Sequence, residues 1–165
     1  MVLKRFSLEE DKMRYPKSCY AFVIALSVVI LSGCSKVPTE DQLLKSATLH
    51  HKSDEFDEAI SDFELLIQKY PTSENVPEAL FAMGTIYLNN KKEYAKAESI
   101  YTKLVMDFPR HATAQGAAYQ RARIFAEHLR KPDSAIAAYE LFLQRYPDAV
   151  SAASAKLELA ALRKK

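Results

Sequence analysis

An aromatic residue followed by proline occurs three times in this chain, and its spacing constrains the fold more than any other feature. The pairs are Tyr70-Pro71, Phe108-Pro109 and Tyr146-Pro147, and the two intervals between them are equal. We call this interval the repeat period. Proline disfavours helical geometry in the residue before it, so each pair predicts the end of a helix. The interval lies within the range of roughly 20–50 residues that is typical of a chain built from stacked copies of one supersecondary unit.

The residues before each pair form the apolar face of a helix. In the middle copy, Ala97, Tyr101, Leu104 and Phe108 follow the spacing i, i+4, i+7 and i+11, which places them on one face. A second helical stripe lies upstream of this face, with Gly84 near its centre. We therefore predict a hairpin of two helices in each copy, and because one hairpin cannot bury its apolar face alone, the hairpins stack. Small residues are expected where the paired helices approach closely, at Ala59, Gly84, Ala97, Ala122 and Ala135.

Composition and charge favour a helical chain and argue against a nucleic-acid binder. The 165 residues suffice for one domain, and only three are glycine, which is costly inside helices. The formal net charge of +2 comes from residues 1–33, so residues 34–165 are neutral and lack the basic excess of a nucleic-acid-binding protein. Residues 34–78 are acidic and residues 79–165 basic, which we interpret as solvated helix surface rather than as a field that steers a partner.

An uncharged and largely apolar run occupies residues 18–35, after a basic stretch. Such a run is typical of an export signal; a membrane-spanning helix is the alternative, for which the run is at the short limit. The end of the run, Leu31-Ser32-Gly33-Cys34, resembles the lipobox of bacterial lipoproteins. The resemblance implies that residues 1–33 are a signal peptide that is removed, that Cys34 carries a covalent lipid, and that residues 34–38 form a short tether.

The residues around the lipobox lead to three further expectations. Ser35 stands where an aspartate tends to retain lipoproteins of enteric bacteria in the inner membrane, so the resemblance implies the periplasmic face of an outer membrane. The first twelve residues are acidic for the start of a signal peptide, and we expect Met13 to be the true start. Thr39 and Gln42 match a capping box, which predicts that a helix begins directly after the tether.

The middle copy of the repeat, with Leu80, Met83-Gly84, Tyr87, Ala97, Tyr101 and Pro109, resembles the tetratricopeptide repeat. Its long period and its aromatic-proline endings are similar to those of the repeats in envelope lipoproteins. The resemblance implies an all-α, superhelical solenoid of about three hairpins with a C-terminal capping helix. We place the hairpins at about residues 39–71, 76–109 and 114–147, and the capping helix at 150–164, within a repeat domain of residues 39–165.

A lipobox followed by three such hairpins resembles the BamD-like lipoproteins of the β-barrel assembly machinery. The resemblance implies a periplasmic scaffold whose partners are other envelope proteins, either a subunit of that machinery or unfolded outer-membrane chains. Three alternatives remain open: coordination of cell-wall synthesis with the Tol-Pal system, an adaptor in pilus or secretin assembly, and a structural spacer or adaptor in a surface secretion system. Tol-Pal coordinators usually carry a coiled coil before the repeats, for which residues 35–41 leave no room.

In tetratricopeptide solenoids the first helix of each hairpin lines a concave surface. That geometry implies a partner-binding groove at Leu43, His50, Phe81, Thr85, Asn89, Tyr119 and Arg123. Phe81, Tyr119 and Arg123 are of residue types that dominate binding hot spots. Aromatic residues in repeats more often pack than recognise a partner, so both roles remain open for Phe81 and Tyr119.

The sequence contains no motif that predicts catalysis. There is no phosphate-binding glycine loop, zinc-protease motif, nucleophile elbow or cysteine pair. His50 and His51 invite a metal site, but adjacent helix positions point about 100° apart, and a solvated helix end is the favoured interpretation. We therefore expect no enzymatic activity, no small-molecule substrate, no metal and no cofactor apart from the covalent lipid on Cys34.

Overall fold

The computed structural model describes residues 37–164, which contain seven α-helices, one π-helical turn and no strand. From Pro38 onwards the chain forms one compact unit. The predicted signal peptide, the lipobox residues Leu31, Ser32 and Gly33, and Cys34 lie outside the described residues. The prediction of an all-α helical-repeat solenoid is confirmed.

The seven α-helices form three hairpins and a closing helix. The second helices start at positions 56, 94 and 132, so they keep the repeat period of the sequence. The closing helix occupies the inner part of the predicted range 150–164. The hairpins are α2 (Glu40–Lys52) with α3 (Phe56–Lys69), α4 (Val76–Asn89) with α5 (Tyr94–Asp107), and α6 (Ala112–Arg123) with α7 (Pro132–Arg145), followed by α8 (Ala152–Leu162).

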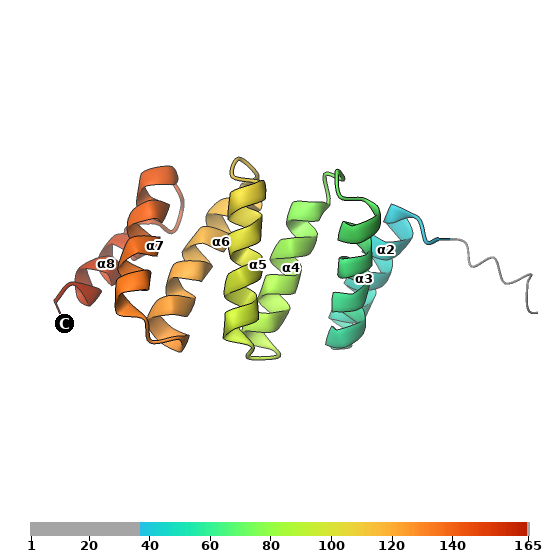
Figure 1. The fold of residues 1–165 in the computed structure, drawn as a ribbon, viewed down its shortest axis with the longest axis horizontal. Coiled ribbons are helices and arrows are strands. Elements are labelled where there is room, and N and C mark those ends of the chain that lie inside the picture. The colour runs from blue at the N-terminus through green and yellow to red at the C-terminus, as the bar shows by residue number, and fades with distance from the viewer. Residues whose placement is uncertain (1–36, 165) are drawn as a thin grey trace, which may run out of the picture. The chain divides into compact units, whose positions relative to one another are not determined.

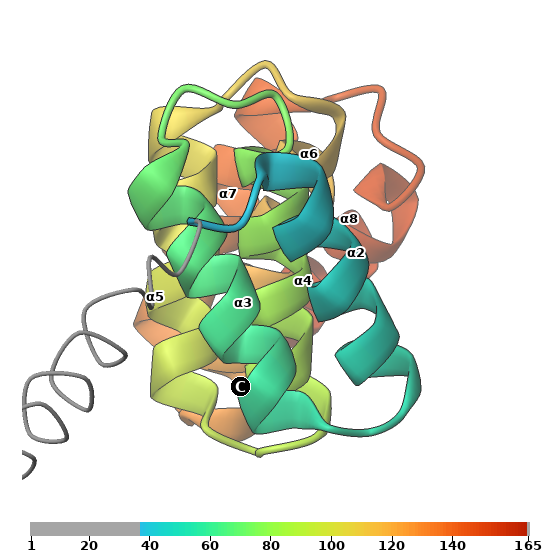
Figure 2. The ribbon, with the colours of Figure 1, turned by 90° about the vertical axis from the view of Figure 1, so that its right-hand side faces the viewer.

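The hairpins follow one another along the long axis of this unit (Figure 1). Loops after α3 and α5 lie along one edge, and the loop between α4 and α5 lies along the opposite edge (Figure 1). Viewed down the long axis, α3 and α5 lie on one side and α2 and α4 on the other (Figure 2). First helices therefore share one face of the solenoid, which is the face expected to bind a partner.

Side-chain and backbone bonds fix the point where the chain enters the fold. The predicted capping box is confirmed: the Thr39 N–H donates to Gln42 Oε1 at 2.9 Å, and the Gln42 N–H donates to Thr39 Oγ1 at 3.3 Å. The Tyr70 hydroxyl, at the end of α3, donates to the carbonyl of Pro38 at 3.0 Å. The first residues of the unit are thereby held against the turn between the first two hairpins.

Each turn inside a hairpin contains one residue in the left-handed backbone region. These residues are Asp54, Lys92 and Arg130, with φ of 61°, 58° and 51°. They are separated by one repeat period each, so the strained position belongs to the repeat. Glycine is the residue that adopts this conformation most readily, and because none stands here the sequence offers no signal for it.

The small residues expected between the paired helices lie in the core. Ala59, Ala97, Ala122 and Ala135 are all 0% exposed. A Cβ added to Gly84 on α4 would lie 2.5 Å from Cε1 of Tyr101 on α5, well inside van der Waals contact. Tyr101 itself is 1% exposed, so its ring occupies the space that a side chain at position 84 would need.

The first helix of the third hairpin departs from the pattern of the second. It begins at Ala112, before the predicted position 114, and continues beyond Arg123 as the π-helical turn η1 (Ile124–His128). The Leu129 N–H closes this turn on the Ile124 carbonyl at 2.9 Å. π-helical turns are rare and frequently occur at functional sites.

Candidate binding groove

The predicted groove residues come from α2, α4 and the helix formed by α6 and η1. The structure divides them into core residues, half-buried residues and exposed residues. Leu43 on α2 is 3% exposed and belongs to the hydrophobic core, so its prediction as a groove residue is wrong. It has the same place in its hairpin as Phe81 and Tyr119, but its shorter side chain is covered by its neighbours.

His50 is engaged within its own hairpin. Its Nδ1 lies 3.0 Å from Asp62 Oδ2 on α3, and its Nε2 lies 3.8 Å from Glu55 Oε2. The ring of adjacent His51 packs against Phe56 in a T-shaped arrangement, with ring centroids 6.2 Å apart. Among residues 37–164, no three histidine, cysteine or acidic side chains are grouped so that they could hold a metal ion.

Phe81 and Thr85 lie one turn apart on α4 and both reach Tyr101. The Phe81 ring centroid is 5.7 Å from that of Tyr101, and Phe81 Cε2 is close to Gly116 on α6. The Thr85 hydroxyl donates to the Phe81 carbonyl at 2.9 Å and lies 3.2 Å from the Tyr101 hydroxyl. Phe81 is half-buried, so it packs between two hairpins with one part of its ring and faces the groove with the other.

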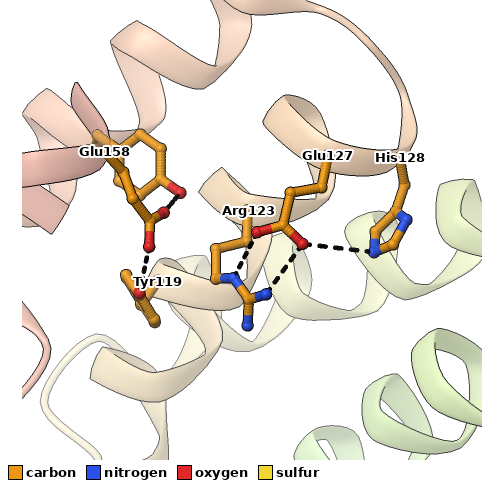
Figure 3. A network of polar contacts seen from close by, with 6 residues as sticks. Tyr119, Arg123, Glu127, His128 and Glu158 are labelled. Carbon is orange, nitrogen blue, oxygen red and sulfur yellow. Dashed lines mark hydrogen bonds and ion pairs between the residues drawn. The ribbon is translucent and has the colours of Figure 1, made fainter. Parts of the chain in front are cut away.

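Tyr119 has the equivalent place on α6 and joins three helices. Its ring packs against Tyr139 and Phe142 of α7, with centroid distances of 6.2 and 5.6 Å. Its hydroxyl donates to Glu158 Oε1 on α8 at 2.8 Å (Figure 3). The Tyr139 hydroxyl donates to the other oxygen of the same carboxylate. Burial and the bond to Glu158 raise the pKa of both tyrosines. This carboxylate thereby fixes α8 to the third hairpin.

Arg123 and Glu127 form a bidentate ion pair on the helical segment that follows Tyr119. Arg123 Nε and Nη2 donate to the two carboxylate oxygens of Glu127, each at 2.9 Å (Figure 3). These bonds raise the pKa of the Arg123 guanidinium, which carries its charge at any physiological pH. The next residue, His128, stacks on Tyr94 at the start of α5, with centroids 4.0 Å apart and planes 2° from parallel.

A cleft of about 130 Å³ lies between the second and third hairpins; we call it the inter-hairpin cleft. Exposed Asn89, at the end of α4, forms part of its wall. The π-helical turn carries Glu127 and His128 along the third-hairpin side. The polar and aromatic lining consists of Asn89, Lys92 and Tyr94 from the second hairpin, and Gln120, Arg123, Glu127 and His128 from the third.

Most residues that line the inter-hairpin cleft, and Glu158 beside Tyr119, are not indicated by the sequence analysis. The sequence places Glu158 in a capping helix without a role, although it stands one repeat period after Gln120 and continues the register of the first helices. Gln120 and Lys92 do not stand out because neither interrupts an apolar pattern. The repeat period could therefore have indicated that Glu158 lies on the same face as Gln120. The residues that line the cleft cannot be recognised in this way, because they are brought together only where two hairpins meet.

The face formed by the first helices presents half-buried aromatic rings and the charged ends of side chains. Of the predicted groove residues, all except Leu43 retain partial or full exposure. This arrangement resembles a docking surface in which rigid aromatic side chains are preorganised by packing. Within the described range, every helix is too short or too polar to cross a membrane.

Comparisons with known proteins agree with this architecture. The family model YfiO, described as outer membrane lipoprotein, matches residues 37–165. A comparison with curated proteins gives no match. Among solved structures, the Arabidopsis OM64 TPR domain is similar, with a TM-score of 0.56 and 17% identity over 76% of this chain and 94% of that chain. At this identity the similarity shows the fold alone.

The family match spans the whole described region, and the fold is that of tetratricopeptide repeats. The chain belongs to the outer membrane lipoprotein family, as a tetratricopeptide-repeat protein that resembles BamD.

Proposed function

We propose that this protein is a periplasmic scaffold that binds its partners in outer-membrane β-barrel assembly through the face formed by its first helices. It acts by binding and not by catalysis. The observation that carries the proposal is the family match over residues 37–165 together with a groove that keeps Phe81, Thr85, Asn89, Tyr119 and Arg123 accessible. Its partner is another subunit of the assembly machinery or an unfolded outer-membrane chain.

In this proposal residues 1–33 are removed as a signal peptide and a lipid on Cys34 holds the protein in the outer membrane. The tether to the fold is short, since Pro38 already accepts a bond from Tyr70. A fully extended chain spans at most about 3.6 Å per residue, so the four steps from Cys34 to Pro38 cover no more than about 14 Å. The solenoid then works close to the inner surface of the membrane.

Site-specific photo-crosslinking in living cells tests the proposal. Asn89 is the position of choice because it is exposed and a bulky photoreactive residue there displaces no core contact, whereas Phe81 packs on Tyr101. Met106 on α5, which is 72% exposed, is the matched control on a second helix. Mass spectrometry identifies what each position captures.

We expect position 89, and not position 106, to capture a β-barrel assembly subunit or unfolded outer-membrane chains. Capture of Tol-Pal, cell-wall or secretin components at position 89 would move the protein to one of the alternative pathways. Adducts at position 106 with none at position 89 would contradict the proposal that partners bind on the face formed by the first helices.

A further inference from the structure

Helix α8 carries an uncharged outer face, although it is the last helix of the row that the structure describes (Figure 1). Its inner side packs on the third hairpin through buried residues such as Ala155 and Leu159. On the outer side Leu157 is 74% exposed, and the residues around it are exposed as well: Ala153, Ser154, Ala160 and Ala161. Because successive helix positions are about 100° apart, these residues form one stripe centred on Leu157, which we call the α8 stripe.

The earlier hairpins show what normally lies against this stripe. One repeat period before Ala160 stands Ala122, which is 0% exposed, and one period before that stands Gly84, which lies against Tyr101 of α5. The position is therefore buried in both hairpins, and in the second it is covered by a helix. Ala160 is exposed, because no helix within residues 37–164 has the corresponding place beside α8.

The opposite end of the solenoid has a different outer surface (Figure 1). The outward stripe of α2 holds three charged residues, Asp41, Lys45 and Lys52, beside Leu44 and Leu49. A polar outer face of this kind keeps the end of a repeat protein soluble, whereas a helix that is apolar on all sides is normally buried. We therefore expect another helix to cover the α8 stripe.

The α8 stripe is complementary to itself. Ala153 stands four positions before Leu157, and Ala160 and Ala161 stand three and four positions after it, so reversing the helix direction exchanges small residues for small residues. Two copies of α8 can therefore pack antiparallel about a twofold axis at Leu157, in a contact that uses the same surface of both copies. Leu157 then lies against Leu157 of the second copy, and Ala153 lies beside Ala160 of the second copy. Small side chains at these positions allow the two helices to approach closely.

The charges at the two ends of α8 suit the same antiparallel arrangement. Asp148 lies in the loop before α8 and Lys164 follows its last turn, and both are exposed. Neither takes part in an ion pair found within residues 37–164. An antiparallel pair brings Lys164 of each copy toward Asp148 of the other, whereas a parallel pair brings like charges together. Lys156 and Arg163 lie beside the stripe, where their long side chains can reach solvent.

We propose that the α8 stripe binds a second copy of this chain in an antiparallel, twofold-symmetric contact. The inference goes beyond the proposed binding of assembly partners, since it concerns the end of the solenoid and a copy of the chain itself. Two helices of this length offer less surface than the roughly 1,200–2,000 Å² that stable complexes bury, so the dimer is weak and reversible. A covalent trap is therefore the suitable measurement.

Cysteine trapping of the full chain in living cells, with copper phenanthroline as the oxidant, tests the contact. Leu157→Cys places a thiol on the twofold axis, where it meets the same thiol of the second copy. Leu49→Cys on α2 and Met106→Cys on α5 are matched controls, because these side chains are 61% and 72% exposed and lie outside the stripe. The parent chain controls for Cys19 and Cys34. Non-reducing gels measure the dimer, and mass spectrometry identifies the linked peptides.

We expect Leu157→Cys to yield a disulfide-linked dimer, and the two controls and the parent chain to stay monomeric. When Ala153→Cys and Ala160→Cys chains with different tags are co-expressed, the mixed dimer should exceed the dimer of either chain alone, because only an antiparallel pair brings these two positions together. Asp148→Lys in both chains should reduce the mixed dimer. Adding Lys164→Asp to the same chains should restore it, since the charges are then exchanged.

No dimer at position 157, or dimers at positions 49 and 106 that are as abundant, would overturn the proposal. Adducts of position 157 with a different protein would mean that another partner covers the stripe, and an excess of dimers of the Ala153→Cys chain alone would mean a parallel pair; either result refutes the contact. Thermal melting of each variant checks that its fold is intact. Photo-crosslinking from position 89 tests the proposed function separately, so either proposal can fail without the other.

Discussion

Replacing Gly84 by alanine tests the close approach of the two helices in the middle hairpin. The added Cβ would lie 2.5 Å from Cε1 of Tyr101 and 2.9 Å from Cδ1 and Cζ, whereas carbon atoms pack at about 3.5–4.0 Å. Tyr101 cannot move aside easily, because it is 1% exposed and its ring packs on Phe81. Helix α4 and helix α5 must therefore separate, or the tyrosine must leave its rotamer.

Two effects of opposite sign decide how much Gly84→Ala changes the free energy of unfolding. Overpacking of a well-filled core typically costs about 1–3 kcal/mol, and an overlap of about 1 Å with a rigid ring belongs in the upper part of that range. Alanine in place of glycine inside a helix gains about 1 kcal/mol. We expect a net loss of about 1–2 kcal/mol in the free energy of unfolding, which lowers the melting temperature by about 3–10 °C.

Chemical denaturation followed by circular dichroism measures this loss, and Gly116→Ala is the matched control. A Cβ at Gly116 would lie 3.3 Å from Cε2 of Phe81, whose half-buried ring has room to shift. The control gains helix propensity with little overlap, so we expect it to be as stable as the parent or more stable. A Gly84→Ala variant as stable as the parent would refute the argument that this glycine is required by Tyr101.

Three further predictions follow from the same structure and sequence. Ala97→Leu, at a fully buried position, should cost about 1–3 kcal/mol in denaturation experiments, while Ala95→Leu on the exposed face of α5 should cost far less; equal losses would contradict the assigned register. Burial and the bond to Glu158 raise the pKa of Tyr139 above its ordinary 10.0, so the unfolded chain loses its proton first and stability falls as the pH rises above about 10. Tyr139→Phe should show a shallower fall, and parallel alkaline profiles would argue against this linkage. Cys34→Ala should leave the precursor uncleaved and without lipid, as seen by gel mobility and labelling with radioactive palmitate; normal processing would disprove the anchor.

Much of the fold could be predicted because it depends on local and periodic features. A proline after an aromatic residue ends each second helix, and the repeat period aligns the small side chains of successive hairpins. The capping box at Thr39 marks the start of α2 through residues three positions apart. Such signals act over a few residues, so they can be recognised without knowing the tertiary structure.

The groove was predicted less well, because the exposure of a residue depends on which neighbours cover it. Leu43 and Phe81 have the same register, yet Leu43 is buried and Phe81 is half-buried. Glu158 is the opposite case: the sequence analysis gave it no role, and the structure shows that it bonds two tyrosines. Its bonds to Tyr119 and Tyr139 link residues 39 and 19 positions apart, and they depend on the direction in which α8 packs on the third hairpin.

The sequence by itself determined that the chain is a stack of helical hairpins, where each second helix ends, and which small residues lie between paired helices. Those properties follow from backbone sterics and from helix periodicity, which act along the chain. The tertiary structure alone decided the left-handed turn residues, the π-helical turn after Arg123 and the inter-hairpin cleft with its two cations. These features arise where separate hairpins meet, and a side chain there is exposed or buried according to what packs beside it.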